Sequence, residues 1–304
     1  MENICTTNSL VKRYGHFTAL DRLSISVPRG AIYGLVGRNG AGKTTLLRIL
    51  SGLQRPTSGT FSLYGAESGT PEIRKAQQRM GAVIETPSIY LGFTAEENLK
   101  QQCRVLGLPS FQNVPELLSL VGLSRTGKRK ARHFSLGMRQ RLGIAVALVG
   151  DPDFLLLDEP ANGLDPEGIV ELRELILKLN RERDITVLIS SHILDELARL
   201  ATHYGFLDHG RAVQEVSAEE LEAACRKCMR VTVSETAPLA AALGEKGIPH
   251  KIHSSRDADI YGEISVSELA EIVKAAGCTL LTVQEHNETL EGFFMRLVGG
   301  SDNA

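Results

Sequence analysis

The sequence predicts an α/β fold built on a parallel sheet, and two kinds of local pattern carry that prediction. The runs 31–36, 153–157 and 185–190 are apolar without alternation, as expected for strands that are covered on both faces. Leu and Ile recur at helical spacing in 44–52 and 167–183. Because strands that alternate with helices form parallel sheets with right-handed crossovers, these segments favour a sheet flanked by helices.

The other elements of this first domain follow in chain order. The segment 20–27 alternates apolar and polar residues before a Pro-Arg-Gly turn, which predicts one strand with a solvated face. The region 86–150 is mostly helical in its spacing, with helices expected at 95–106, 115–121 and 137–149. We therefore expect a helical subdomain inserted into the α/β layers, and we expect partner contacts on it.

A second, smaller domain is predicted after residue 215. Residues 211–304 hold 9 Lys and Arg against 15 Asp and Glu, a balance of −6, whereas residues 1–210 have a balance of +4. Strands and helices are expected at 229–234, 237–245, 258–264, 267–276, 279–283 and 290–298. The domains are therefore expected to be 1–215, which is α/β, and 216–304, a small α+β appendage.

Composition excludes several classes of protein. Lys and Arg total 34 against 36 Asp and Glu, so the formal net charge of −2 lacks the cationic excess of a dedicated nucleic-acid binder. No stretch without charged residues exceeds 11 residues, while a membrane-spanning helix needs about 20 mainly apolar residues. The first residues do not resemble a secretory signal. We therefore expect a cytosolic protein that neither binds nucleic acid nor crosses a membrane.

The five cysteines give little evidence of a metal or redox site. Cys225 and Cys228 have CxxC spacing, but a zinc site needs about four ligands and no second CxxC occurs in the sequence. We expect two small side chains on a helix.

A glycine-rich loop between a predicted buried strand and a helix is the strongest chemical signal. The segment 37–44, Gly-Arg-Asn-Gly-Ala-Gly-Lys-Thr, matches the pattern in which backbone N–H groups surround phosphate oxygens at a helix N-terminus. The lysine charge suits the β and γ phosphates, and the Thr44 hydroxyl suits Mg²⁺. The residues expected to bind the nucleotide are Gly37, Asn39, Gly40, Ala41, Gly42, Lys43, Thr44 and Thr45.

Two carboxylates follow a second buried strand. Asp158 and Glu159 come at the end of Phe-Leu-Leu-Leu, where ligands of open α/β sheets bind. We expect Asp158 to hold Mg²⁺ and Glu159 to orient and deprotonate the attacking water. A carboxylate here could instead cap a helix, but together with the glycine-rich loop the pair predicts nucleotide hydrolysis.

From about residue 11 to 210 the sequence resembles the ATP-binding cassette (ABC) family. Tyr14 lies 29 residues before Lys43, similar to the family's adenine-stacking aromatic, although an aromatic here also fits simple packing. Residues 134–138, Phe-Ser-Leu-Gly-Met, resemble the family signature Leu-Ser-Gly-Gly-Gln and keep Ser135 and Gly137.

Two further motifs extend the resemblance. Asn-Gly-Leu-Asp, ending at Asp165, resembles the loop that communicates across the family's dimer. His192 resembles the switch histidine, which would polarise the γ-phosphate or hold Glu159 and water in line.

The basic run 128–132 fits an acidic partner, lipid headgroups or a solvated helix end.

One departure from the family pattern narrows the resemblance. Glu85 stands where the family usually has a glutamine, and its carboxylate could reach Mg²⁺ while adding a negative charge there. Glu85 and the altered signature together make the sequence similar to the exporters that give bacteria resistance or immunity to bacitracin and lantibiotic peptides.

The resemblance implies a P-loop NTPase of the ABC ATPase type that uses ATP and Mg²⁺. It implies a head-to-tail homodimer, in which Ser135, Gly137 and Asp165 meet the nucleotide bound by the other subunit. It also implies a separate membrane permease and a peripheral location on the cytoplasmic face of the cell membrane. The alternatives are a multidrug, polysaccharide or lipid exporter, or a soluble ABC ATPase without a transport role.

Overall fold

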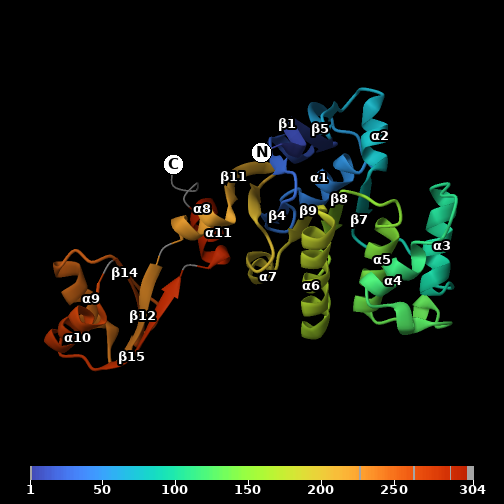
Figure 1. Ribbon diagram of the computed structural model, residues 1–304. Helices are drawn as coiled ribbons and strands as arrows, with labels where there is room; N and C mark the ends of the chain where they lie inside the picture. The colour runs from blue at the N-terminus through green and yellow to red at the C-terminus, as the bar shows by residue number, and fades with distance from the viewer. Residues whose placement is uncertain (1, 226, 263, 288, 300–304) are drawn as a thin grey trace. The chain divides into compact units, whose positions relative to one another are not determined.

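The computed structural model describes residues 2–225, 227–262, 264–287 and 289–299. The chain forms two compact units, Met1–Glu219 and Glu220–Ala304. The sequence predicted the boundary between the two domains at residues 215 and 216, close to the boundary between these units. The element labels in the text are those of Figure 1.

The first unit is organised by a six-stranded sheet with the order β11-β10-β4-β9-β8-β7. The strands β10, β4, β9, β8 and β7 pair in parallel, and β11 is antiparallel to β10. Their bounds are β4 Ile32–Gly37, β7 Met80–Val83, β8 Phe154–Asp158, β9 Thr186–Ser191, β10 His203–Asp208 and β11 Arg211–Ser217. Every residue of β4, β8 and β9 is buried, which confirms the three predicted buried strands.

Helices cover both faces of this sheet. The helix α1 (Lys43–Leu50) shares a core with Leu156 and Leu188 on one face. The helix α6 (Pro166–Arg183) and the short α7 (Leu194–Ala198) surround Ile189 on the other face. Since neighbouring residues of a strand point to opposite faces, this arrangement explains why β8 and β9 read as continuous apolar runs.

A second, antiparallel sheet packs over α1. Its path is β2-β1-β5-β6, and β3 also pairs with β1. The bounds are β1 Asn3–Tyr14, β2 Phe17–Leu23, β3 Ser26–Pro28, β5 Ser58–Leu63 and β6 Ala66–Glu67. The prediction of one strand over 20–27 is therefore wrong, because the chain leaves its pairing after Leu23 and starts a new strand at Ser26. The interruption is held by Thr7, whose hydroxyl accepts a hydrogen bond from the Ile25 N–H at 2.9 Å.

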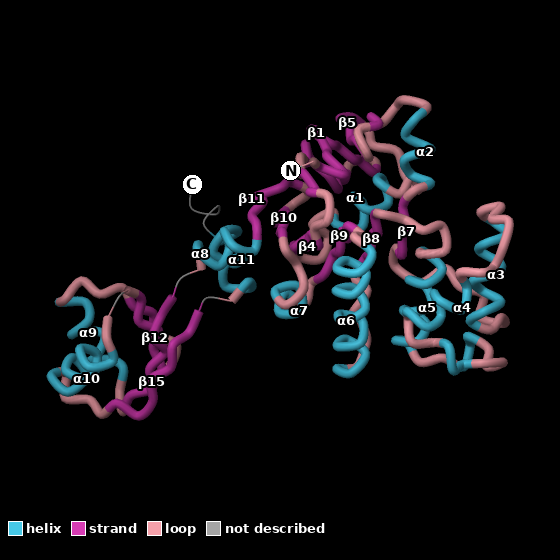
Figure 2. The backbone as a smooth tube through the Cα atoms, in the orientation of Figure 1, coloured by secondary structure: helices cyan, strands magenta, loops and turns pink. Residues whose placement is uncertain are grey.

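The predicted helical subdomain is confirmed. The structure has α3 (Ala95–Val105), α4 (Val114–Leu120) and α5 (Leu136–Ala147) in this region, grouped at one side of the first unit (Figure 2). The helix α2 (Glu72–Gln78) lies before the predicted range 86–150. The helix α3 begins with a capping box, in which the side chains of Thr94 and Glu97 each bond to the other's backbone N–H.

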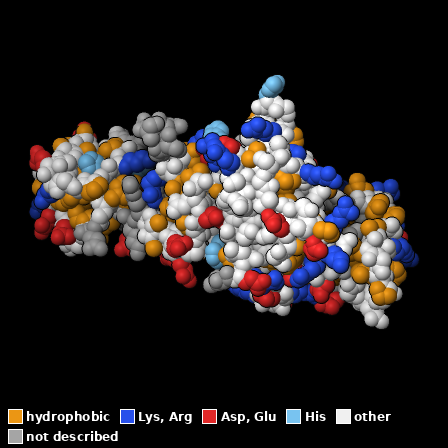
Figure 3. Space-filling model, turned by 90° about the horizontal axis from the view of Figure 1, so that it is seen from above, with side chains coloured by type: hydrophobic (Ala, Val, Ile, Leu, Met, Phe, Trp, Pro, Cys, Tyr) orange, Lys and Arg blue, Asp and Glu red, His pale blue; other side chains and the backbone are white. Residues whose placement is uncertain are grey.

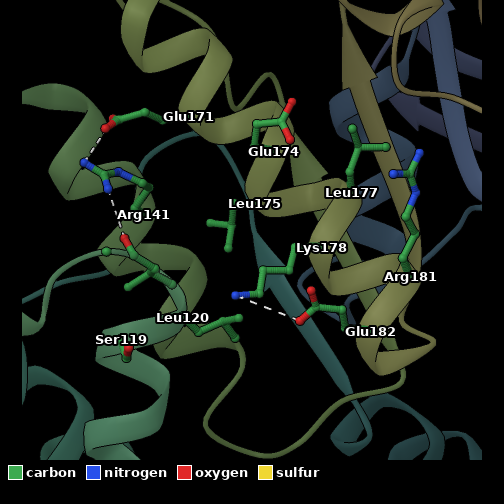
Figure 4. A pocket seen from close by; sticks show the side chains of 12 residues that line it. Ser119, Leu120, Arg141, Glu171, Glu174, Leu175, Leu177, Lys178, Arg181 and Glu182 are labelled. Atoms are coloured by element: carbon green, nitrogen blue, oxygen red, sulfur yellow. Dashed lines mark hydrogen bonds and ion pairs between the residues drawn. The ribbon is translucent and has the colours of Figure 1, made fainter.

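One arginine connects this subdomain to α6. The guanidinium of Arg141 donates to the Val121 carbonyl at 3.0 Å and pairs with Glu171 at 3.1 Å, beside a cavity of about 500 Å³ between α4 and α6 (Figure 4). Arg141 lies on α5, so these contacts connect α5 to α4 and α6.

The second unit has a ferredoxin-like βαββαβ arrangement, and its sheet order is β13-β14-β12-β15 with antiparallel neighbours. Its elements are α8 Ala218–Ala224, which begins in the first unit, β12 Lys227–Val233, α9 Thr236–Glu245, β13 His250–Ile252, β14 Asp257–Tyr261, α10 Val266–Ala275, β15 Leu280–Asn287 and α11 Leu290–Gly299. The expectation of an α+β unit is confirmed, and β13 is an additional strand.

The five cysteines form no disulfide. In the first unit, Cys5 and Cys103 are fully buried, and burial raises the pKa of the Cys5 thiol to about 12. In the second unit, Cys228 is buried on a strand, Lys227–Val233, and Cys225 follows a helix that ends at Ala224. The expectation that both lie on a helix is therefore wrong. Cys225 and Cys278 are half-buried. Within the described residues, no group of three or more His, Cys, Asp or Glu side chains could hold a metal ion.

Charge is dispersed over the surface. Basic and acidic side chains are interspersed on the face seen in Figure 3, in keeping with a net charge of −2. Among the helices that the structure describes, none is both long and apolar enough to span a bilayer.

Candidate nucleotide-binding site

The glycine-rich loop lies between β4 and α1, as predicted. Gly42 is the N-cap of α1 and has φ 103°, a conformation that glycine adopts without a steric cost. A Cβ at this position would lie 2.6 Å from the Ala19 carbonyl oxygen and 2.6 Å from the Leu20 side chain. The loop therefore packs closely against β2 and presents the N-terminus of α1, which is a favourable place for an anion.

Lys43 is held within this loop. Its side chain is 5% exposed, and its ammonium donates to the carbonyls of Gly37 at 2.7 Å and Arg38 at 3.3 Å. The same nitrogen lies 3.3 Å from Glu159 Oε1. A buried ammonium needs such partners, and together they place a positive charge where the loop would receive phosphates.

The hydroxyl of Thr44 meets the carboxylate of Asp158 at the end of β8. Thr44 Oγ1 donates to Asp158 Oδ1 at 3.1 Å, and Ser190 Oγ on β9 donates to the same oxygen at 2.7 Å. Asp158 is almost fully buried. These hard oxygen donors fit Mg²⁺, which takes one or two protein ligands and completes its shell with water and substrate phosphates.

Glu159 is fixed on both of its carboxylate oxygens. Oε1 faces Lys43, while Oε2 accepts from the His192 N–H at 3.1 Å and lies 2.5 Å from His192 Nδ1. Its backbone has φ 47°, and its N–H donates to the Ser190 hydroxyl at 2.9 Å. Of the two expected roles for His192, the structure shows the contact with Glu159.

Two aromatic rings border the cavity at the β1–β2 hairpin. Tyr14 and Phe17 are register partners, and their exposed fractions are 41% and 60%. The Lys12 ammonium lies 5.1 Å from the centre of the Tyr14 ring, and the Tyr14 hydroxyl bonds to Gln54. Exposed rings beside a phosphate-binding loop can stack on a base.

These groups line one cavity of about 540 Å³. The sequence-predicted residues that it brings together are Tyr14, Asn39, Gly40, Ala41, Gly42, Lys43, Thr44, Thr45, Glu159 and His192. Phe17 and Arg48 also line it, and sequence reasoning missed both of them. The tight Gly15–His16 turn was a signal for Phe17, because it places that residue opposite Tyr14.

Glu85 lies against a basic residue of this cavity. Its carboxylate pairs with the Arg48 guanidinium. Since Arg48 lies on α1, the pair links the segment after β7 to the helix that follows the glycine-rich loop.

The remaining predicted residues are not among those that line the cavity. Ser135 caps α5, where its hydroxyl accepts from the Met138 N–H at 3.2 Å. Asp165 caps α6 and accepts from the Gly168 N–H at 3.1 Å. A Cβ at Gly137 would lie 3.8 Å from the Leu164 side chain, so the signature segment lies beside the loop that precedes α6.

Comparisons with known proteins agree with this site. A family model described as ABC transporter matches residues 20–162. A bacitracin transport ATP-binding protein of Bacillus licheniformis is 38% identical over 303 residues, which is 99% of this chain and 99% of that protein. A lantibiotic transport ATP-binding protein of Streptococcus pyogenes is 44% identical over 207 residues, 68% of this chain and 88% of the relative.

Solved structures show the same fold. An ATP-binding subunit of an ABC transporter is 29% identical with a TM-score of 0.63, and the match covers 73% of this chain and 92% of that chain. A nucleotide-free ATP-binding cassette from an ABC transporter is 26% identical with a TM-score of 0.64, covering 72% and 93%.

Proposed function

This chain belongs to the family of ABC transporter ATP-binding proteins and is an ATPase, and from that premise we propose that it powers a separate membrane permease that exports a peptide antibiotic of the bacitracin or lantibiotic class. The observation that carries the proposal is the 38% identity to a bacitracin transport ATP-binding protein over 99% of both chains. The match therefore includes the second unit as well as the ATPase unit.

ATP would bind with its phosphates on the glycine-rich loop. Lys43 and the N-terminus of α1 would hold the β and γ phosphates. The base would stack on Tyr14, and Phe17 extends the same aromatic surface. Asn39, Ala41 and Thr45 would contribute backbone or side-chain contacts along the loop.

Mg²⁺ would be held by Thr44 and Asp158, whose oxygens already lie 3.1 Å apart. When bound, the ion neutralises charge on the β and γ phosphates. Glu85 would join this site only by leaving its pairing with Arg48.

Glu159 would act as the base that orients and deprotonates the attacking water. Its Oε2 is fixed by His192 and its Oε1 by Lys43, so the carboxylate can change partner without a large movement when a γ-phosphate reaches Lys43. His192 would then serve as the positioning residue of Glu159.

The active form would be a head-to-tail homodimer. Ser135 and Gly137 begin α5 outside the chain's own cavity. In a dimer of this kind the N-terminus of α5, together with Asp165, would face the nucleotide bound by the partner. Two composite sites would then close around two ATP molecules.

The permease would dock on the helical subdomain. Tyr90, Leu91 and Phe93 are large apolar residues with exposed fractions of 55%, 47% and 38%, and the Tyr90 and Phe93 rings stack 5.1 Å apart. Arg132 donates its N–H to the Leu91 carbonyl, so the basic run 128–132 adjoins this aromatic cluster. An apolar cluster with a basic rim suits a permease segment at the membrane surface, which would place the chain on the cytoplasmic face.

Export is tested in a strain that lacks this chain. Wild-type protein should restore growth in bacitracin or a lantibiotic, because only ATP turnover resets the permease. Glu159→Gln should not restore growth, although it still binds ATP, and the exposed Glu167→Gln variant is the matched control and should behave as wild type. The minimal inhibitory concentration is the measurement, and the tagged chain should co-purify with a membrane protein.

Three outcomes would contradict the proposal. A change in tolerance only to non-peptide drugs would favour a multidrug exporter. A change only in the polysaccharide or lipid content of the cell envelope would favour an exporter of those molecules. Full rescue by Glu159→Gln would remove the assigned role of Glu159.

A further inference from the structure

The second unit has a polar sheet face that α9 and α10 do not cover. Val231, Val233, Ala258 and Ile260 point into the core beneath these two helices, which lie together on one side of the sheet (Figure 2). Since side chains alternate along a strand, Arg230, Asp259 and their neighbours point to the opposite face. A cavity of about 860 Å³ lies there, bounded by β12, β13, β14 and the start of α11.

A buried carboxylate on this face is fully engaged. The Asp259 side chain is 6% exposed. Its oxygens accept from Arg230 Nε at 2.7 Å, Arg230 Nη2 at 2.9 Å and His253 Nε2 at 2.7 Å. The Arg230 hydrogen bond holds the pKa of Asp259 at about 2. Asp259 is therefore ionised, and its charge is already neutralised within the protein.

The cavity keeps further cationic donors. Lys251 is the register partner of Asp259 across β13 and β14, and within the described residues its ammonium has no hydrogen bond or ion pair. Arg230 uses Nε and Nη2 on Asp259, which leaves Nη1 for a ligand.

The charges around the cavity oppose those of its surroundings. The lining includes Arg230, Lys251 and Arg296 against Asp259 and Glu291, although residues 211–304 carry a balance of −6. Because Arg230 is paired with Asp259, Lys251 and Arg296 remain against Glu291, and the cavity is a basic site in an acidic unit. Its volume lies in the range of about 300–1,000 Å³ that is typical of small-molecule sites.

We propose that this cavity binds a small molecule that carries a phosphate group. The Lys251 ammonium and the Nη1 edge of Arg230 reach the cavity from β13 and β12. A phosphate group carries about two negative charges and offers three acceptor oxygens to these donors, whereas a carboxylate carries one charge. The rest of the ligand would lie against Tyr261 and Met295, which also line the cavity.

Methyl NMR on the full chain tests this site directly. The chain has five methionines, and Met295 lines the cavity while Met80 and Met138 belong to the first unit. With ¹³C-methyl methionine, inorganic phosphate should shift the Met295 signal in a saturable manner at constant ionic strength. Met295→Leu assigns the signal.

Two lysine variants and a loop variant decide the outcome. Lys251→Gln should weaken the phosphate affinity read at Met295 about tenfold, because a charge-assisted contact is lost. Lys274→Gln, an exposed lysine on α10, should leave it unchanged. Lys43→Ala should also leave it unchanged, which separates this site from the glycine-rich loop and from the export function.

The proposal is overturned if phosphate produces no saturable Met295 shift, or if Lys251→Gln and Lys274→Gln give equal affinities. It is also overturned if citrate saturates the signal and phosphate does not, or if Lys43→Ala abolishes the shift.

Discussion

Ser190 connects the two carboxylates that follow β8. Its hydroxyl donates to Asp158 Oδ1 at 2.7 Å and accepts from the Glu159 N–H at 2.9 Å, and the side chain is fully buried. One small residue therefore sets the orientation of the expected metal ligand and of the expected base. Ser190 is therefore a positioning residue, which acts through Asp158 and Glu159.

Replacing Ser190 with Ala should raise the Mg²⁺ concentration needed for half-maximal ATPase activity several-fold. The loss of a hydrogen bond to a buried carboxylate also costs about 1–3 kcal/mol of unfolding free energy. A magnesium titration of ATPase activity and a denaturant titration give the two values. Ser191→Ala is the matched control, because its hydroxyl bonds locally to Ile193. An unchanged magnesium titration would show that Ser190 has only a structural role.

Some site residues could be predicted from sequence and others could not, for a geometric reason. Lys43, Thr44 and Glu159 belong to continuous motifs, so their places in the chain were enough. Phe17 reaches the cavity through the β1–β2 register, and Arg48 through the rotation of α1. Such positions depend on pairing and packing between elements, which no short motif specifies.

The loop between β4 and α1 allows two glycines to be compared. Gly40 and Gly42 both have positive φ, 84° and 103°. An added Cβ would meet nothing within 4 Å at Gly40 but would lie 2.6 Å from a backbone oxygen at Gly42. A substitution at Gly40 therefore tests backbone strain alone, whereas a substitution at Gly42 tests strain together with steric overlap.

Gly42→Ala should weaken ATP binding at least tenfold, because the loop must move away from β2 to admit the methyl group. Gly40→Ala should cost only the strain of positive φ, about 1 kcal/mol of stability. Equilibrium binding of a fluorescent ATP analogue and thermal unfolding would be measured for both. Equal affinities would contradict the close packing at Gly42.

Elements with a uniform environment were predictable, and elements that change partners were not. The strands β4, β8 and β9 are buried throughout, which leaves an uninterrupted apolar run in the sequence. By contrast, β1 pairs with β2, β3 and β5 and has register shifts in each pairing. Its buried and exposed residues therefore follow no simple period, and its sequence gave no clear strand signal.

At the scale of the whole molecule, the proposed dimer can be tested at Gly137. The nearest atom to an added Cβ is 3.8 Å away, so Gly137→Asp should fold and bind ATP normally. A negative charge at the N-terminus of α5 would repel the partner's γ-phosphate, and hydrolysis should stop. Wild-type turnover would contradict the composite site.

A mixing experiment tests the head-to-tail arrangement itself. Gly137→Asp and Lys43→Ala chains should each be inactive, but a mixed dimer would contain one intact site. ATPase activity should therefore reappear on mixing the two variants. Its absence, with dimers confirmed by light scattering, would count against this arrangement.

The second unit should lose stability in acid through Asp259. Its pKa is lowered from 3.8 to about 2, mainly by the Arg230 hydrogen bond. A carboxyl with a depressed folded pKa stabilises the fold above its ordinary pKa and loses that effect as the pH falls toward 2. The shift corresponds to about 2 kcal/mol.

Asp259→Asn should therefore be less stable than wild type at pH 5, and the difference should shrink by pH 2. Denaturant unfolding followed at the Met229 methyl signal gives both values, with the exposed Glu245→Gln as control. A difference that does not change with pH would contradict this assignment.

The distribution of thiols makes the two units chemically distinguishable. Alkylating reagents attack the thiolate, so a fully buried cysteine with a pKa of about 12 is inert at neutral pH. The first unit holds Cys5 and Cys103, both fully buried, while the partly exposed Cys225 and Cys278 belong to the second. A maleimide dye added to the unaltered protein would consequently label the C-terminal unit alone, and would supply an optical probe of that unit during ATP turnover.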